Sequence, residues 1–152
     1  MGNGDRAVAE QKKDIIPSKR NSGKLMTPDN TFREAIEVFY RNGLYYFLWS
    51  EDDTRSENYR VRYATATSPT GTLTIPENNL ILAKRPEKGI YGTGHNSVIQ
   101  VPGKDEWYIV YHLFTRPSGI KMGDAAGFHR EVCIDKMEFY AYGGIKPIEP
   151  TL

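Results

Sequence analysis

The sequence predicts an all-β protein, and three features of its pattern support this class. Runs rich in Val, Ile, Tyr, Phe and Trp follow one another at short intervals from residue 32 onward. Clusters of Gly, Pro, Asn and Ser separate these runs, as turns require. No segment repeats its apolar residues at a helical period over a useful length. A sandwich, a barrel and a propeller all fit, because periodicity alone does not distinguish them.

The first predicted hairpin joins the runs 36–41 and 44–50 through Asn42-Gly43. Both turn residues tolerate positive φ, so a two-residue type I′ turn is the natural connection. Glu34 lies just ahead, where the apolar alternation has not begun, which places it at a strand end. A carboxylate held at the head of a rigid hairpin can be aimed at a ligand, although an exposed carboxylate at the rim of a sheet is the commoner outcome.

Further strands are expected downstream of this hairpin. The run 59–66 alternates so that Tyr59, Val61 and Tyr63 share one face, with two arginines on the other. A short strand at 80–83 follows it. Two more hairpins pair 95–101 with 107–114 around Pro102-Gly103-Lys104-Asp105, and 130–139 with 145–148 around Tyr142-Gly143-Gly144.

Residues 1–30 are predicted to form one or two short strands within long loops, because Gly and Pro recur among them. Dispersed basic residues in this segment raise a nucleic-acid contact or a targeting signal as alternatives. A solvated loop is favoured, since acidic residues and Pro17 interrupt the basic ones. The basic residues are Lys12, Lys13, Lys19, Arg20 and Lys24.

Composition narrows the classes of partner. The chain has 152 residues, of which 39% are hydrophobic, enough for the core of one ordinary domain. Its formal net charge of +1 is too small to attract nucleic acid or an anionic membrane through the overall electric field of the protein. No apolar run approaches the roughly 20 residues of a membrane span, and the first residues lack the order of a secretory signal. Cys133 is the single cysteine, which excludes an internal disulfide and predicts a small buried residue.

Two polar positions at strand ends are candidates for binding. His95 follows a Gly-rich stretch at the mouth of a strand, where it could ligate a metal or bond a substrate hydroxyl. One His does not make a zinc site, whereas an oxygen-rich calcium site with one His and waters is compatible with it. Arg130 follows a loop of small residues, and its planar donor fork suits sugar hydroxyls or a carboxylate. A structural His and a cross-sheet salt bridge are the alternatives.

Aromatic side chains could add a face for a sugar ring. Trp49, Tyr91 and Trp107 are the candidates, although most aromatic residues in such strands belong to the core. Several chemistries lack their usual motifs. The chain contains no Gly-rich phosphate loop, no Gly-x-Ser-x-Gly elbow and no His-Glu-x-x-His. The sequence therefore gives no sign of phosphoryl transfer, serine esterase chemistry or zinc proteolysis.

The phrase EAIEVFYRNGLYYFLWS, which begins at Glu34, resembles a conserved phrase of glycoside hydrolase family 43, the five-bladed β-propeller arabinosidases, arabinanases and xylosidases. Further phrases follow in the family's order: YRVRYATATSPTG, GTGHNSVIQ, EWYIVYH and REVCIDKMEF. Together they extend from Phe32 to Thr151. Each phrase alone is a weak signal, and five in order are a strong one.

The resemblance implies roles for individual residues. Glu34 matches the general acid that protonates the departing glycosidic oxygen, and His95 matches the histidine at the propeller axis that contacts calcium or its waters. Arg130 lies near the family's substrate-contacting arginine, and Trp49, Tyr91 and Thr93 are expected to contact substrate. The phrase also departs from the family. Ala35, Ile36 and Glu37 stand where Gly, Pro and often His follow the acid, which alters the expected backbone path.

The resemblance also implies a partial propeller of about three blades of four-stranded antiparallel sheets. Residues 1–31 are then a remnant of an earlier blade and loop, and residues 32–152 are the C-terminal blades. Inversion requires a second carboxylate roughly 6.5 to 9.5 Å from the acid. The family carries this base and a third carboxylate in Asp-Pro contexts that this sequence lacks, and none of Asp5, Asp14 and Asp29 matches them. We therefore expect the sequence to begin after both aspartates.

The function so implied is an inverting glycoside hydrolase that acts on arabinose- or xylose-containing plant polysaccharides, truncated at its N-terminus and without its base. No cofactor is required, and calcium is compatible. The expected partner is an arabinan- or xylan-derived oligosaccharide, and the expected location is periplasmic or extracellular, although the chain shows no signal peptide. The alternative is a non-catalytic carbohydrate-binding or interaction module that keeps the propeller fold.

Part of a propeller leaves unpaired edges and uncovered blade faces. We therefore expect the chain alone to self-associate, to pair with a missing N-terminal piece, or to be marginally stable. Light scattering and calorimetry check this expectation. A monodisperse monomer of high thermal stability would contradict it.

Overall fold

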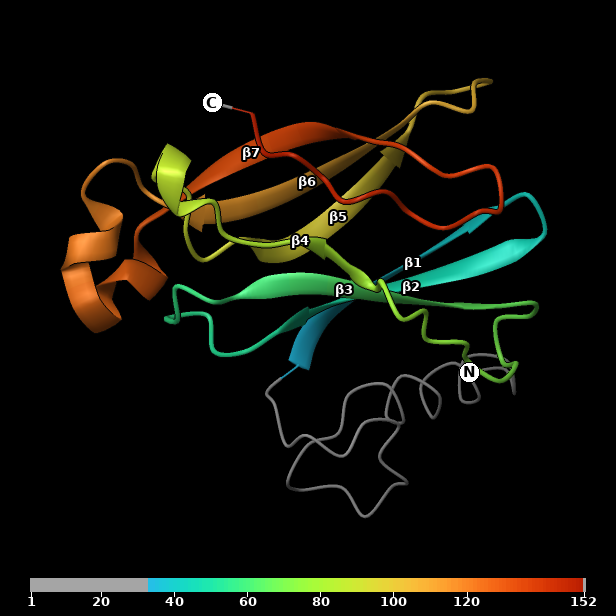
Figure 1. Cartoon of the computed structure of the whole chain (residues 1–152), viewed down its shortest axis with the longest axis horizontal. Coiled ribbons are helices and arrows are strands. Elements are labelled where there is room, and N and C mark those ends of the chain that lie inside the picture. The colour runs from blue at the N-terminus through green and yellow to red at the C-terminus, as the bar shows by residue number, and fades with distance from the viewer. Residues whose placement is uncertain (1–32, 152) are drawn as a thin grey trace, which may run out of the picture.

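A computed structural model describes residues 33–151, and these residues form two antiparallel sheets (Figure 1). The first sheet has the order β1-β2-β3-β4 and the second has the order β5-β6-β7. The strands are β1 (Arg33–Arg41), β2 (Leu44–Glu51), β3 (Arg60–Ala66), β4 (Leu80–Leu82), β5 (Gly94–Gln100), β6 (Trp107–Phe114) and β7 (Arg130–Met137). The predicted all-β class is confirmed, and each predicted strand except 145–148 is present, with its ends shifted by at most three residues.

The first hairpin has the predicted turn. Arg41 pairs with Leu44, and the two residues between them, Asn42 and Gly43, have φ values of 48° and 85°. Positive φ at both central positions is the requirement of a type I′ turn, whose twist matches that of the flanking strands. The hairpin therefore fixes the register in which the start of β1 pairs with the end of β2. In this register Glu34 pairs with Ser50.

Two short 3₁₀ helices interrupt the strands where the sequence indicated only loops. They are η1 (Pro86–Lys88) and η2 (Gly119–Phe128), and η2 is broken at Gly123, whose φ is 56°. Such short helices are common connectors and carry too little periodic signal to be read from sequence. Neither of these helices, in the part of the chain that the structure describes, has the length and apolarity of a membrane span.

The main core lies between the two sheets. Alternate residues of β2 and β3 point into it, and alternate residues of β6 meet them from the other side. The predicted shared face is confirmed, because Val61 and Tyr63 of β3 and Tyr59 just before it are all buried. The buried members of this core are Tyr46, Leu48, Val61, Tyr63, Ile81, Leu82, Ile90, Trp107, Ile109, Tyr111, Leu113, Met137, Ile145 and Ile148.

The two sheets differ in how their other faces are covered. A second cluster, formed by Phe47, Trp49, Ala64 and Ala66, lies on the opposite face of the first sheet, so β2 is buried on both sides. In the second sheet the outer side of β7 is exposed, and Val132 and Ile134 keep 76% and 55% of their surface. A sheet covered on both faces is what a blade between two neighbours requires, whereas the second sheet has only one neighbour among the described residues.

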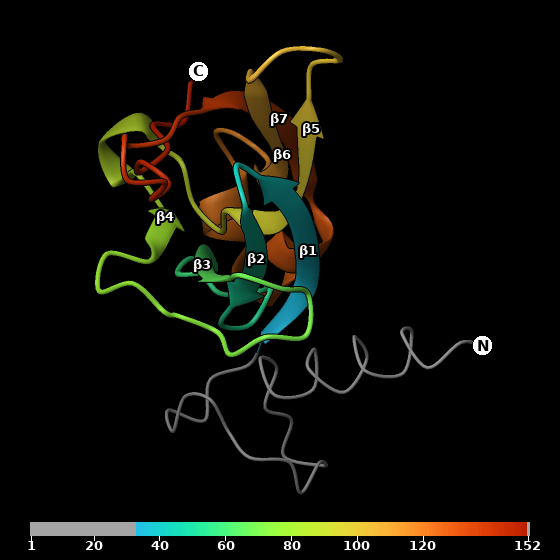
Figure 2. The same cartoon turned by 90° about the vertical axis from the view of Figure 1, so that its right-hand side faces the viewer.

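The chain after β7 adds no fourth full strand to the second sheet. It makes isolated hydrogen bonds to each of the two sheets instead. The expected strand 145–148 is reduced to a bridge between Phe139 and Ile145. Pro147 has no N–H for a ladder, and the next residue, Ile148, donates its N–H to the carbonyl of Ile81 in β4 at 2.7 Å. Figure 2 shows this C-terminal segment beside β4. Residues 1–31, the predicted remnant of an earlier blade, lie outside the described residues.

Candidate active site

Glu34 and His95, predicted from separate strands, meet where the two sheets come together. Glu34 is the second residue of β1, and His95 is the second residue of β5. Glu34 Oε1 lies 3.9 Å from His95 Nδ1, and the two side chains keep 31% and 58% of their surface. A carboxylate and an imidazole at this spacing, both open to solvent, can exchange protons with a bound molecule.

The same backbone device aims both side chains. The ladder between β1 and β2 shifts register between Glu34 and Glu37, and Ala35 has a φ of 53°. The ladder between β5 and β6 shifts between Gly94 and Ser97, and His95 itself has a φ of 53°. β-Bulges redirect a side chain away from the regular alternation. The two bulges therefore turn the side chains of Glu34 and His95 out of the regular strand alternation and toward each other.

Ala35 shows that the altered phrase after Glu34 keeps the backbone path that a glycine would favour. Its φ of 53° lies in the left-handed region, which costs an L-residue with a Cβ about 1–2 kcal/mol. The backbone therefore adopts a left-handed conformation at this position with alanine in place.

We expect Ala35→Gly to raise the free energy of unfolding by up to about 1 kcal/mol, because relief of left-handed strain exceeds the entropy that glycine adds to the unfolded chain. Urea denaturation measures the change. Ala125→Gly is the matched control, since Ala125 is exposed and is not among the positive-φ residues; it should lower stability by about 0.5–1 kcal/mol. Destabilisation by both variants alike would refute the strain at Ala35.

Tyr59 fixes the orientation of Glu34. Its hydroxyl donates to Glu34 Oε1 at 2.6 Å, and the ring is fully buried. Burial, and then the hydrogen bond to Glu34, raise the pKa of Tyr59 well above its usual value, so the hydroxyl keeps its proton. The other oxygen of the carboxylate, Oε2, makes no hydrogen bond to residues 33–151. That oxygen is left to meet a ligand.

His95 is held through its backbone. Its N–H donates to the Ser50 hydroxyl at 2.7 Å, and Ser50 is the residue that pairs with Glu34 across the β1–β2 ladder. Gly94, just before it, packs directly against the Tyr59 ring, so that a Cβ at this position would overlap the ring atoms. A side chain there is excluded by close packing rather than by backbone conformation.

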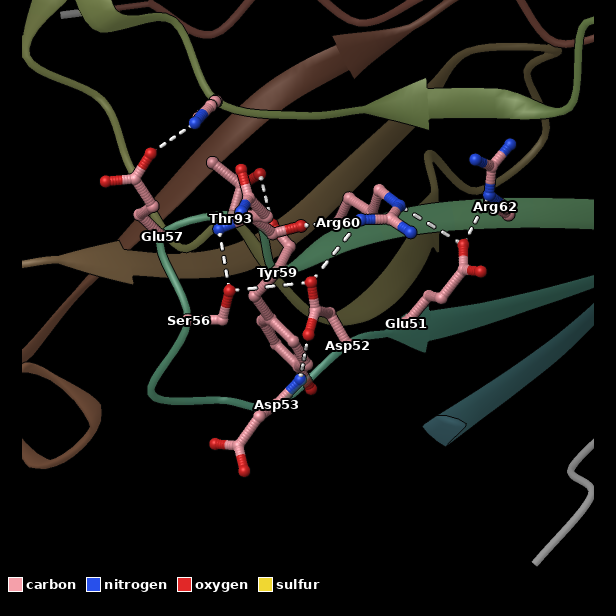
Figure 3. Close-up of polar contacts among 11 residues, drawn as sticks. Glu51, Asp52, Asp53, Ser56, Glu57, Tyr59, Arg60, Arg62 and Thr93 are labelled. Atoms are coloured by element: carbon pink, nitrogen blue, oxygen red, sulfur yellow. Dashed lines mark hydrogen bonds and ion pairs between the residues drawn. The ribbon is translucent and has the colours of Figure 1, made fainter. Parts of the chain in front are cut away.

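The loop between β2 and β3 that carries Tyr59 is braced by polar contacts (Figure 3). Asp52 accepts a hydrogen bond from Ser56 at 3.4 Å and lies 3.5 Å from Arg60. The buried carboxylate of Glu51 is paired with Arg60 at 3.3 Å and with Arg62. A buried carboxylate is tolerated only when its charge is paired in this way. These contacts fix where β3 begins, and with it the position of Tyr59.

Arg130, the predicted substrate-binding arginine, ties this loop to the second sheet. It donates to the Gly92 carbonyl at 3.0 Å, to the Gly127 carbonyl at 3.2 Å, and to the carbonyl and hydroxyl of Thr54. Its guanidinium also lies 4.7 Å from the centre of the Phe114 ring. Burial lowers the pKa of Arg130. One of its five N–H donors has no partner among the described residues, so any sugar contact would use that donor.

His112 backs His95 from the interior. The imidazole rings of His95 and His112 stack with 5.5 Å between their centres. The Tyr59 ring also stacks on His112, with 6.0 Å between the ring centres. Its Nδ1 is buried and makes no hydrogen bond within the described part of the chain. Burial, followed by the charges of Arg130 and His95, lowers the pKa of His112 to about 4. At neutral pH the ring is therefore neutral.

Because the pKa of His112 is lower in the folded chain than the usual value of about 6.5, the unfolded chain takes up the proton first as the pH falls. Stability should decrease from about pH 6.5 to about pH 4, by up to about 3 kcal/mol, and His112 adds no further slope below that. Urea midpoints across this range measure it. His112→Gln should flatten the slope and the exposed His129→Gln should not; an equal slope in both variants would exclude His112 as its source.

The other predicted contact residues are less accessible. Trp49 is 2% exposed within the second cluster, and Thr93 is fully buried with its hydroxyl donating to the Tyr59 carbonyl at 3.3 Å. Neither offers a surface that a sugar could touch in this structure, because packing of the sheet takes up both side chains. Trp107 belongs to the main core. Tyr91 is half-buried, and its carbonyl accepts the N–H of Phe114 at 2.9 Å.

Sequence reasoning missed Tyr59, Ser50 and His112 as parts of the site. Tyr59 was assigned only to a strand face shared with Val61 and Tyr63, and its hydroxyl partner depends on the packing of two elements. His112 carried a signal, since it interrupts the apolar alternation of β6. Cys133, predicted to be buried, is half-buried against the core, and burial raises its pKa.

Calcium would need more ligands than these residues supply. A calcium ion takes about six to eight oxygen ligands, and within residues 33–151 no three His, Cys, Asp or Glu side chains are grouped for a metal. His95 would therefore supply at most one of the ligands of a calcium ion.

The two sheets are antiparallel like the blades of a propeller, with a carboxylate near the head of a strand, and comparison with known proteins identifies the family. The sequence model of "Glycosyl hydrolases family 43" matches residues 3–145. This chain belongs to glycoside hydrolase family 43. The predicted partial five-bladed propeller is thereby confirmed.

Two curated relatives support the assignment. A β-D-galactofuranosidase of Aspergillus niger is 37% identical over 145 residues, which is 95% of this chain and 39% of the relative. A xylosidase/arabinosidase of Thermoclostridium stercorarium is 28% identical over 153 residues, 95% of this chain and 29% of the relative. The chain thus spans well under half the length of these relatives.

Solved structures agree with the sequence relatives. A thermostable family-43 glycoside hydrolase superposes with a TM-score of 0.68 at 36% identity, covering 80% of this chain and 36% of that one. Another glycoside hydrolase gives a TM-score of 0.71 at 30% identity, covering 82% and 26%. An arabinanase of Cellvibrio cellulosa complexed with arabinohexaose, at 18% identity and a TM-score of 0.59, shares the fold.

Proposed function

We propose that this chain supplies the general acid of an inverting glycoside hydrolase that acts on arabinose- or xylose-containing plant polysaccharides. One observation carries the proposal: Glu34 is held through one oxygen by the Tyr59 hydroxyl at 2.6 Å, while the other oxygen has no partner among residues 33–151. A general acid needs a fixed carboxyl group with one oxygen free to reach the departing oxygen. Family membership supports the class of reaction.

In the proposed reaction, protonated Glu34 gives its proton to the glycosidic oxygen as the bond from that oxygen to the anomeric carbon breaks. A water molecule attacks the anomeric carbon from the opposite face, and a carboxylate base takes a proton from it. The products are a sugar of inverted configuration and a free hydroxyl on the departing group. We assign the base to no residue between 33 and 151.

The substrate class rests on the names of the relatives. These are a galactofuranosidase and a xylosidase/arabinosidase, so both furanose and pyranose sugars are represented. Arabinose- and xylose-containing oligosaccharides are the substrates we propose for this chain. Such polymers lie outside the cell membrane, which supports a periplasmic or extracellular location.

The proposal is tested by incubating arabino- and xylo-oligosaccharides with a protein that contains the complete family domain and following their hydrolysis by proton NMR within the first minutes. The first product anomer should have the configuration opposite to that of the substrate bond. Retained configuration would contradict inversion. Binding without hydrolysis, by a protein that contains the complete family domain, would instead favour a non-catalytic carbohydrate-binding module.

A further inference from the structure

A pocket of about 550 Å³ lies away from Glu34, at the opposite end of the first sheet. Leu44 lines it at the start of β2, whereas the partner of Glu34 is Ser50 near the end of that strand. Six residues of extended chain separate the two by about 20 Å. The volume is in the range of about 300–1,000 Å³ that small-molecule sites occupy. The pocket is therefore distinct from the candidate active site.

Its walls are mixed in character. Tyr63 and Thr65 of β3 form one wall, Glu77 and Asn78 of the segment before β4 form another, and the C-terminal turn at 140–145 closes the third side. Hydroxyl, amide and carboxylate groups thus surround an opening that also contains aromatic rings. This combination suits a neutral ligand with many hydroxyl groups better than an anion, which Glu77 would repel, or a lipid, which would leave the polar groups unpaired.

Tyr63 provides a buried polar group directed to this pocket. Its side chain is 2% exposed, and its oxygen accepts the N–H of Ile145 at 3.2 Å. The O–H of Tyr63 donates to no acceptor among the described residues. A buried hydroxyl with an unused donor favours an acceptor supplied from outside the fold, such as the hydroxyl oxygen of a ligand.

The rim of the pocket carries a fixed aromatic surface. Tyr142 is 77% exposed, and its ring stacks on Tyr140 at 5.2 Å between centres with 8° between planes. Gly144 permits this placement, since a Cβ there would lie 2.5 Å from the Tyr142 ring. A ring held in this way loses little freedom when it binds. Its free face is open to the C–H face of a sugar ring.

We propose that this pocket is a second carbohydrate site, which binds a short stretch of a neutral oligosaccharide against Tyr142 without cleaving it. The proposal rests on the proposed function for the type of sugar, namely arabino- or xylo-oligosaccharide. A site about 20 Å from Glu34 would hold a polymer near the site of cleavage and raise the effective local concentration of its bonds.

Titration of the isotope-labelled chain with arabinohexaose and xylohexaose, followed by amide NMR, tests this. At least one sugar should shift the signals of residues 63–65 and 140–145, and Tyr142→Ala should weaken that binding about tenfold. Tyr40→Ala is the matched control, because Tyr40 is also exposed and its ring packs against another tyrosine ring, but it does not line the pocket; it should leave affinity unchanged. Thermal denaturation of both variants checks that they fold.

Shifts confined to the surroundings of Glu34 and His95, an unchanged affinity in Tyr142→Ala, or no binding of either sugar would each overturn the second site. Hydrolysis, measured in parallel on a protein that contains the complete family domain, separates this proposal from the first. Hydrolysis without binding at residues 140–145 refutes the second site alone. Binding at residues 140–145 that is weakened by Tyr142→Ala supports it even where the proposed reaction fails.

Discussion

Glu34→Gln should lower kcat/KM by about 10²- to 10⁴-fold on substrates with poor leaving groups, such as natural oligosaccharides, because these need proton donation to the departing oxygen. Aryl glycosides with good leaving groups depart as stable anions and should lose far less, under about tenfold. Glutamine keeps the shape of the side chain and can still accept the Tyr59 hydrogen bond, so the fold around Tyr59 should persist.

The rates are measured in a protein that contains this chain and hydrolyses both kinds of substrate. Glu138→Gln is the control, since Glu138 is 56% exposed and pairs with Lys146 at the surface, at 3.6 Å. It should leave both rates within about twofold of the parent, because exposed ion pairs contribute little. Equal losses on natural and aryl substrates in Glu34→Gln would remove Glu34 from the role of general acid.

Gly94→Ala should lower the free energy of unfolding by about 1–3 kcal/mol, because the added methyl group overlaps the buried Tyr59 ring. The ring has little room to retreat, since it is fully buried and its hydroxyl is bound to Glu34. Displacement of Tyr59 would also release Glu34. Stability and glycosidase activity should therefore fall together.

Urea denaturation in two backgrounds isolates the clash. In Tyr59→Leu the ring is absent, so adding Gly94→Ala should cost clearly less than it does in the parent chain. Ser97→Ala, at an exposed position of the same strand, should change stability by less than about 0.5 kcal/mol. The same cost of Gly94→Ala with and without the Tyr59 ring would show that backbone effects, not packing, exclude a side chain.

The strands and turns were predictable because their signals are local. Asn42-Gly43 specified both the turn and the register of β1 on β2, which placed Glu34 at a strand end as expected. The approach of Glu34 to His95 was not predictable from periodicity, because it depends on how two sheets pack.

The site residues that sequence reasoning missed act through contacts between distant segments. The hydroxyl of Tyr59 and the N–H of His95 find their partners only once three strands are assembled. Conversely, Trp49 and Thr93 have side chains suited to sugars, but the sheet packing buries them. Residue type indicates which chemistry is available, and tertiary packing decides which groups reach the ligand.

The C-terminal segment has a consequence for the order of events during synthesis. Ile148 donates to Ile81, and Thr151 donates through its N–H to the Asp135 carboxylate at 3.1 Å. The first sheet therefore leaves the ribosome well before the residues that fasten it to the second. Contacts between such distant segments slow folding and leave apolar surface uncovered in the meantime. A nascent chain that stalls before residue 148 should be a ready target for chaperones, with both sheets made and the core still open.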